Sequence, residues 1–141
     1  MSALENKELL LRVVTKFAAM QLKKDDLLMP FGAMLNTTRN VQLLMPKRIK
    51  QNVTPDELSR YWARELRAAS EKSDSPTVCS CCAGLFPHES GVTVPVVFVH
   101  IEHAGEYSED FYYPYRKEID GEIWFGVRDF EVVDPQVFIA N

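Results

Sequence analysis

The segment over residues 92–103 alternates in a way that restricts the chain to a few architectures. Neighbouring side chains of a β-strand point to opposite sides, and here both sets are apolar. They are Val94, Val96 and Phe98 on one side, and Val97, Val99 and Ile101 on the other. A strand of this kind belongs to a sheet that is covered on both faces. The fold therefore needs helices, or a second copy of the chain, on the two faces of a sheet.

Two segments begin with the spacing of a helix capping box, in which a hydroxyl residue and an acidic residue three positions later satisfy free backbone N–H groups. The first pair, Ser2 and Glu5, precedes apolar residues at helical spacing and predicts a helix over about residues 3–22. The second box, Thr54-Pro55-Asp56-Glu57, also places proline at the first helical position. It predicts a helix that ends near residues 71–73.

The remaining apolar segments predict β-strands. Their ranges are 28–35 and 41–45, forming a hairpin, and then 77–86, 92–103, 107–119 and 122–133. Asp120-Gly121 predicts the turn before the last strand, because both central residues of such a turn need positive φ. The expected fold is a single α+β domain over residues 1–141, with two helices and a mostly antiparallel sheet in the order α-β-β-α-β-β-β-β. Two helices cover one face comfortably and the second only partly, so we expect a homodimer that buries the rest.

The charge of the chain is unevenly distributed. The net charge of −4 combines 13 Lys and Arg against 8 Asp and Glu in residues 1–72 with 3 against 12 in residues 73–141. No apolar segment approaches the roughly 20 residues that span a bilayer, so we expect no membrane association. The N-terminal residues lack the pattern of a secretory signal, and three closely spaced cysteines favour a reducing compartment. These features predict a cytoplasmic protein.

Cys79, Cys81, Cys82 and His88 provide the ligand types that zinc prefers. Their spacing is poor for a metal site, because a strand points Cys79 and Cys81 to one side and Cys82 to the other. We therefore expect buried thiols, with no metal and no cofactor. Metal binding or redox sensing by these four residues is left open by the sequence.

Three polar residues at the end of one predicted strand, His100, Glu102 and His103, suggest a pocket. With a nearby cysteine they would provide the base and nucleophile of a small enzyme or the lining of a ligand site. Strand alternation separates His103 from the other two. We favour a strand-end network in which Glu102 or His103 caps backbone groups of the turn that follows, and we expect no catalytic residues.

Arg60, Arg64 and Arg67 recur on one side of the second predicted helix. Nucleic-acid binding would use such a row to neutralise phosphates. The chain as a whole is acidic and contains no recognised nucleic-acid module, so this function ranks third. The basic row is better explained by complementarity to the acidic half of the chain or to a partner subunit.

The densest aromatic segment lies in the acidic half of the chain, beside several carboxylates. Aromatic residues together with arginine are typical of the centres of protein interfaces. The candidate partner-binding residues are Glu106, Glu109, Asp110, Tyr112, Tyr113, Tyr115 and Arg116. They predict a non-catalytic protein-interaction module whose acidic half meets a basic protein partner.

Several short motifs resemble a pattern found in small uncharacterised bacterial α+β domains. They are Pro30-Phe31, Glu102-His103, Gly105 and Pro114-Tyr115-Arg116. The general layout also looks like that of immunity proteins from bacterial toxin systems, which are small, acidic and non-catalytic. The resemblance implies an immunity-type inhibitor, and it assigns no functional residues. The cysteines have no counterpart in this pattern.

Overall fold

The computed structural model describes residues 2–46, 53–87 and 91–139. The elements are α1 (Ala3–Lys24), β1 (Phe31–Leu35), β2 (Val41–Leu44), α2 (Pro55–Ser73), β3 (Thr77–Pro87), β4 (Thr93–His103), β5 (Tyr107–Lys117), β6 (Ile123–Phe125) and β7 (Asp129–Val132). The strands form one antiparallel sheet in the order β2-β1-β3-β4-β5-β6, in which β7 also pairs with β5. The predicted α+β fold and its element order are confirmed. No helix in the described ranges is both long and apolar enough to cross a membrane.

One difference from prediction concerns the last strand, expected over residues 122–133, which forms two short strands, β6 and β7. Tyr115 pairs with Phe125, whereas Phe111 pairs with Phe130. Residues 112–114 of β5 therefore lie opposite residues 126–129, so the segment that contains β6 and β7 has one additional residue. Such an insertion is a β-bulge, which bends a strand and interrupts its ladder. Gly126 lies at the interruption, and its N–H donates to the Pro114 carbonyl at 2.8 Å.

Both helices begin where the capping boxes place them. The Ser2 hydroxyl accepts a hydrogen bond from the Glu5 N–H, and the Thr54 hydroxyl accepts one from the Glu57 N–H, each at 3.1 Å. α1 continues two residues beyond the predicted end, to Lys24. α2 ends within the predicted range, where the chain turns into the left-handed region at Asp74 (φ 51°).

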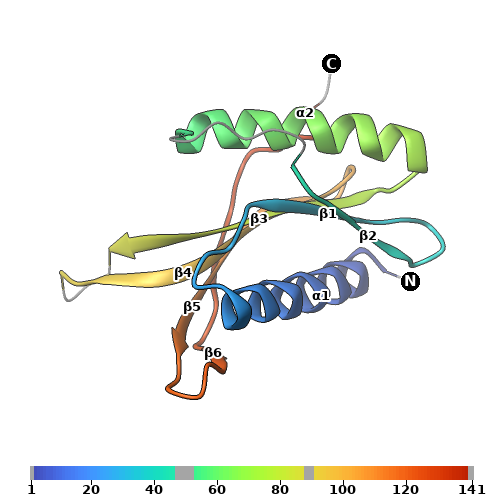
Figure 1. Cartoon of the computed structure of the whole chain (residues 1–141). Helices are drawn as coiled ribbons and strands as arrows, with labels where there is room; N and C mark the ends of the chain where they lie inside the picture. Colours follow the sequence, from blue (N-terminus) through green and yellow to red (C-terminus); the bar gives the residue numbers. More distant parts are fainter. Residues whose placement is uncertain (1, 47–52, 88–90, 140–141) are drawn as a thin grey trace.

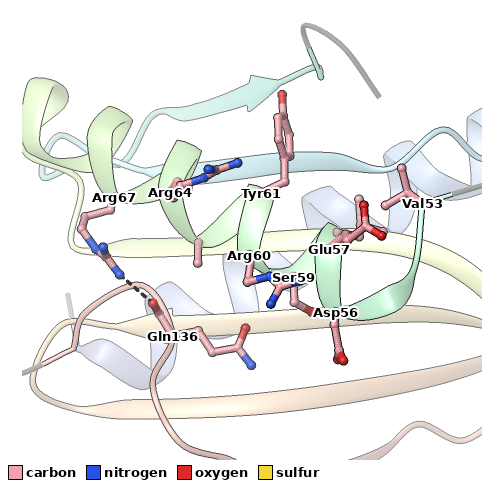
Figure 2. Close-up of a pocket in the computed structure, with 11 residues that line it drawn as sticks. Val53, Asp56, Glu57, Ser59, Arg60, Tyr61, Arg64, Arg67 and Gln136 are labelled. Carbon is pink, nitrogen blue, oxygen red and sulfur yellow. Dashed lines mark hydrogen bonds between the residues drawn. The ribbon is translucent and has the colours of Figure 1, made fainter. Parts of the chain in front are cut away.

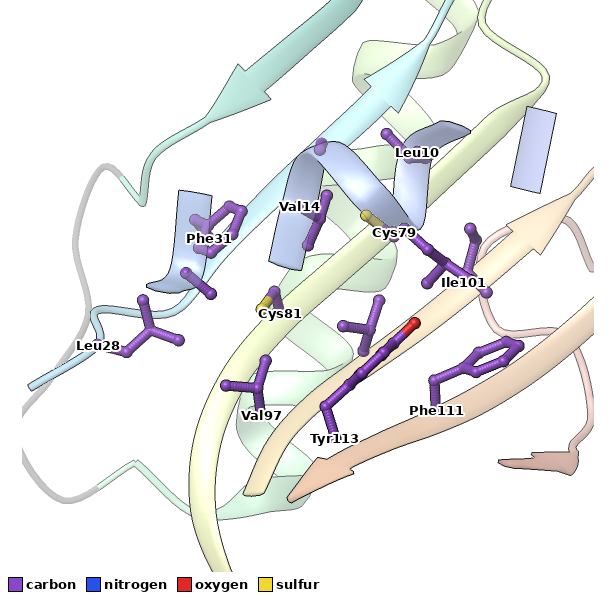
Figure 3. Close-up of a cluster of buried hydrophobic side chains, with 14 of the residues drawn as sticks. Leu10, Val14, Leu28, Phe31, Cys79, Cys81, Val97, Ile101, Phe111 and Tyr113 are labelled. Carbon is purple, nitrogen blue, oxygen red and sulfur yellow. The ribbon is translucent and has the colours of Figure 1, made fainter. Parts of the chain in front are cut away.

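The two helices lie on opposite faces of the sheet (Figure 1). α1 covers the larger apolar cluster, which also contains residues from β1, β3, β4 and β5 (Figure 3). Its central members, fully buried, are Leu10, Val14, Phe31, Cys79 and Val99. This cluster is the main hydrophobic core, and it uses the odd-numbered side chains of β3, β4 and β5.

α2 covers the opposite face over β1 and β3. Trp62 and Leu66 pack with Met34, Val78 and Val137 in a second apolar cluster. A Cβ atom on Gly32 would lie 2.8 Å from Cζ3 of Trp62, so only glycine allows this helix to approach β1 so closely. α2 therefore leaves the β4 and β5 part of its face to other segments. The homodimer stays a prediction. The surface that a second copy would have to cover is now limited to the α2 side of β4 and β5.

Candidate functional site

A charged network lies on the α2 side of β4 and β5. His100 pairs across the ladder with Asp110, and Glu102 lies two residues further along β4 on the same face. The ring nitrogens of His100 contact both carboxylates: Nδ1 lies 2.6 Å from Asp110 Oδ1, and Nε2 lies 2.5 Å from Glu102 Oε2. The exposed fraction is 6% for His100 and 1% for Glu102. A buried group of this kind is costly unless each member is paired, and here each one is.

The network favours a protonated His100. Carboxylates accept hydrogen bonds, so a ring bonded to one on each nitrogen donates from both. Burial acts to lower the pKa of His100, but the bonds to Asp110 and Glu102 and the charges of these groups outweigh it and raise the pKa to about 9. Burial acts to raise the pKa of Glu102, yet the His100 contact and three backbone N–H groups hold it below its ordinary value. At neutral pH His100 is a cation between two anions.

Glu102 also holds the C-terminal strap, which we define as residues 134–139. Its carboxylate accepts hydrogen bonds from the backbone N–H groups of Gln136, Val137 and Phe138 at 2.8–3.1 Å. From the other side, Arg67 of α2 donates to the carbonyls of Gln136 and Val137, both at 2.9 Å. The strap is thus fixed through its main chain between α2 and β4. Glu102 therefore satisfies backbone groups of the strap, and the prediction that it caps the turn after β4 is wrong about which segment it binds.

The pocket predicted from His100, Glu102, His103 and a cysteine is not assembled. His103 lies on the other face of β4, where its Nδ1 is 2.7 Å from the Thr77 hydroxyl and its ring stacks on Tyr107. Both nitrogens of His100 are occupied by carboxylates, so neither is free to accept a proton from a nucleophile.

The three cysteines divide between the faces as strand alternation predicts. Cys79 and Cys81 are buried in the core under α1, and Cys82 lies half-buried on the other face, where it pairs across the ladder with Phe98. Burial raises the pKa of all three thiols, that of Cys82 to about 11. Among residues 2–46, 53–87 and 91–139, no three His, Cys, Asp or Glu side chains gather as a metal site. His88 lies outside the described residues.

A hollow of about 860 Å³ follows the side of α2 (Figure 2). Arg60, Arg64 and Arg67 contribute to its lining together with Asp56 and Glu57. Arg60 and Arg64 are exposed, whereas Arg67 is bound to the strap. The predicted arginine row therefore separates into two exposed cations with acidic neighbours and one structural residue.

The seven candidate partner-binding residues do not lie on one surface. Glu109, Tyr113 and Tyr115 face the α1 side, where Glu109 is buried and paired with Lys7 at 2.7 Å. The α2 side of β5 holds Asp110, Tyr112 and Arg116. Glu106 is exposed in the turn between β4 and β5. Of these residues, only Asp110, Tyr112 and Arg116 border a continuous surface.

We call this surface the acidic aromatic face and define it by Phe86, Phe98, Tyr112, Trp124, Asp129 and Glu131. Phe98 and Phe86 contact Tyr112, with ring centroids 5.3 and 5.4 Å apart, respectively. Asp129 and Glu131 of β7 pair across the ladder with Tyr112 and Asp110. The Tyr112 hydroxyl donates to Glu131 at 2.6 Å. The face therefore consists of half-buried aromatic rings with carboxylates directly beside them.

Trp124 extends the acidic aromatic face toward the β5–β6 hairpin. It is 59% exposed and lies across the ladder from Arg116. Both residues, with Pro114, line a shallow hollow of about 380 Å³ beside the bulge. Exposed tryptophan beside a hollow is typical of a surface that binds a partner.

Comparison with protein-family models, with curated proteins and with solved structures gave no match. What the site can do chemically is therefore inferred from its geometry. Sequence reasoning did not assign functions to Trp124, Asp129, Glu131 or the strap. Trp124 was visible as an apolar residue in an acidic segment, which is the signal that would have identified the face. The strap has no such signal, because Glu102 contacts its backbone.

Proposed function

We propose that the chain is a non-catalytic protein-interaction module that binds a basic protein partner through the acidic aromatic face. The observation that carries this proposal is the position of Asp129 and Glu131 beside Tyr112 and Phe98, on adjacent strands and on one face. Arginine and lysine side chains stack on aromatic rings and pair with carboxylates, so this combination suits a cationic surface.

The charge distribution supports the same partner. Residues 73–141 carry a net charge of −9, and a field of one sign steers an oppositely charged protein toward the surface that produces it. The apolar rings of Phe98 and Trp124 would supply area for binding. A basic toxin domain is the partner that the resemblance to immunity proteins implies, and inhibition by binding requires no catalytic residue or cofactor.

A peptide titration tests this proposal. The probe is the basic pentapeptide Arg-Val-Arg-Val-Arg, added to the ¹⁵N-labelled chain at low salt, with Glu-Val-Glu-Val-Glu as the matched acidic peptide. We expect amide resonances of Tyr112 and Asp129, and the indole of Trp124, to shift with the basic peptide only. The double variant D129N/E131Q should bind it about tenfold more weakly, which corresponds to about 1.4 kcal/mol.

The control variant D25N/E71Q removes the same charge from two exposed acids outside the face. It should retain the binding of the unmodified chain, apart from a small decrease from its altered net charge. Equal weakening by both variants would mean that net charge alone attracts the peptide. Shifts confined to residues outside the face would contradict the proposal directly.

A further inference from the structure

The strand β7 lies at the outer edge of the sheet. In the described part of the chain it pairs with β5 alone, so one row of its backbone groups faces β5 and the other row faces away from the sheet. All four of its residues are exposed. An exposed edge of this kind is a template along which a strand of another chain can pair.

The ladder between β7 and β5 shows which backbone groups of β7 point outward. The Val133 N–H donates to the Ser108 carbonyl at 3.1 Å, and these two residues continue the register of the strands. In an antiparallel ladder, pairs that exchange hydrogen bonds alternate with pairs that do not. Glu131 and Asp129, which lie two and four positions before Val133, therefore direct their backbone groups to β5. The intervening residues of β7 direct theirs away from the sheet.

These outward-facing residues are Phe130 and Val132. The Phe130 N–H donates to the carboxylate of its neighbour Asp129 at 2.9 Å, as expected for a group that does not bond to β5. A strand that adds along β7 would accept hydrogen bonds from the N–H groups of Phe130 and Val132. It would also release the Asp129 carboxylate for another partner. The edge thus presents the backbone of two residues to an added strand.

The two faces of β7 differ in their chemistry. Asp129 and Glu131 lie in the acidic aromatic face, on the α2 side. Phe130 and Val132 point to the α1 side, where the ring of Phe130 stacks on that of Phe111, and they are 54% and 77% exposed. Residues that lie opposite each other on neighbouring strands share a face. A complementary strand therefore alternates cationic side chains, beside the two carboxylates, with apolar ones that cover Phe130 and Val132.

We infer that the basic partner binds by adding an antiparallel strand to β7, with cationic and apolar side chains in alternation. This inference rests on the proposed function, and it specifies which segment of the partner is recognised and how. The backbone groups of Phe130 and Val132 provide affinity, and the alternate side chains provide specificity. The strand pairs of the described sheet are antiparallel, so the added strand continues the same arrangement.

The charges of β7 disfavour a second copy of the chain at this edge. Two β7 strands joined edge to edge about a two-fold axis would place the Asp129 and Glu131 side chains of both copies on one face. Like charges on neighbouring strands destabilise their pairing. A basic strand meets no such repulsion, so the edge selects a partner of opposite charge.

The test uses the peptide Arg-Val-Arg-Val-Arg, blocked at both ends, and two N-methylated versions of it. In an antiparallel strand whose valines lie beside Phe130 and Val132, the valine N–H groups face β7 and the arginine N–H groups face solvent. Methylation of the two valine nitrogens should therefore weaken binding at least about tenfold. Methylation of the nitrogens of the second and third arginines is the matched control and should leave binding unchanged. Amide chemical shifts of the ¹⁵N-labelled chain at low salt measure the three affinities.

Hydrogen exchange of the chain provides a second readout. The Val132 N–H points outward, so its exchange should slow when the peptide binds. The Glu131 N–H already belongs to the ladder with β5, so its exchange should change much less. Binding through side chains alone would slow neither.

A pair of variants removes the outward N–H from the chain itself. Val132→Pro deletes this donor and leaves the ladder with β5 intact, because the Val132 N–H takes no part in it. Val132→Ala removes most of the same side chain and keeps the donor. V132P should bind the unmethylated peptide at least about tenfold more weakly than V132A. Circular dichroism verifies that both variants fold, and the methylated peptides test the unmodified chain if V132P does not.

The proposal is overturned if the two methylated peptides bind equally, or if the valine-methylated peptide binds more tightly. If the unmethylated peptide still binds and shifts Tyr112 and Asp129, the proposed function stands and only strand addition fails. Absence of binding by the unmethylated peptide would overturn both.

Discussion

Both carboxylate oxygens of Glu102 accept a hydrogen bond from the backbone N–H of Val137, at 3.1 and 3.0 Å, although the two residues are 35 positions apart. Glu102 thereby links the middle of the sheet to the strap. Its other neighbour, His100, is held in turn by Asp110. The acidic half of the chain therefore contains a buried charged centre with a structural function, besides the acidic residues at its surface.

Replacing Glu102 with glutamine should destabilise the chain by about 3 kcal/mol, because it leaves a buried imidazolium with one anion and places an amide against N–H donors. Urea unfolding, followed by tryptophan fluorescence, measures this loss. The amide of Val137 should also exchange with deuterium faster than amides in the core under α1.

Glu106→Gln is the matched control for Glu102→Gln. Glu106 lies only four residues away, but it is exposed in the turn after β4. We expect its replacement to change the free energy of unfolding by less than about 0.5 kcal/mol. Similar losses in both variants would show that the buried network contributes no specific stability.

Stability should fall as the pH rises from about 6.5 to about 9. His100 has an ordinary pKa of 6.5 when unfolded and about 9 when folded, so the folded chain holds an additional proton between these values. The stabilisation is complete below pH 6.5 and is lost as the pH passes the folded pKa, by about 3 kcal/mol in total.

Urea unfolding at a series of pH values measures this slope, and His100→Gln provides the comparison. The variant should be less stable near pH 6 and should show little of the decline up to pH 8. Above pH 8 the cysteines of the unfolded chain, with an ordinary pKa of about 8.5, ionise and lower the stability of both proteins. A decline of equal size in both proteins would assign the titration to another group.

Much of the fold was predictable because it follows from local patterns. The alternation over residues 94–101 indicates a sheet that is covered on both sides, and the structure places α1 and α2 on opposite faces of the sheet, although α2 lies over β1 and β3 and not over this strand. The capping boxes at Ser2 and Thr54 are also local, since each donor and acceptor lies within three residues. Such signals do not depend on the rest of the fold.

The charged network and the strap depend on contacts that the sequence does not encode locally. His100 meets Asp110 only because the β4–β5 register pairs them, and Glu102 meets Val137 through a backbone N–H that every non-proline residue has. The bulge at Gly126 similarly changes which side chains of the last two strands share a face. Gly126 was the signal available in the sequence, because a glycine inside a strand often marks a bulge.

Replacing Gly32 with alanine should destabilise the chain by about 1–3 kcal/mol, because the added Cβ would lie 2.8 Å from Trp62 Cζ3 and force α2 away from β1. Gly84→Ala, on β3, is the control. Its Cβ would lie 3.4 Å from Cε2 of Phe86, a distance of ordinary contact, so the effect should be small. Thermal unfolding by circular dichroism compares the two. Equal midpoints would contradict the close packing of α2 on β1.

The thiols should react slowly in the folded chain. Burial raises the pKa of Cys82 to about 11, so at pH 8 its reactive thiolate is about 100-fold scarcer than that of an ordinary cysteine, and Cys79 and Cys81 lie in the core. Titration with a disulfide reagent such as DTNB should detect three thiols in guanidinium chloride. In buffer, Cys82 should react first and slowly, and Cys82→Ser should abolish this early phase. Rapid reaction of two thiols in buffer would contradict the buried arrangement and favour redox sensing by the Cys81-Cys82 pair.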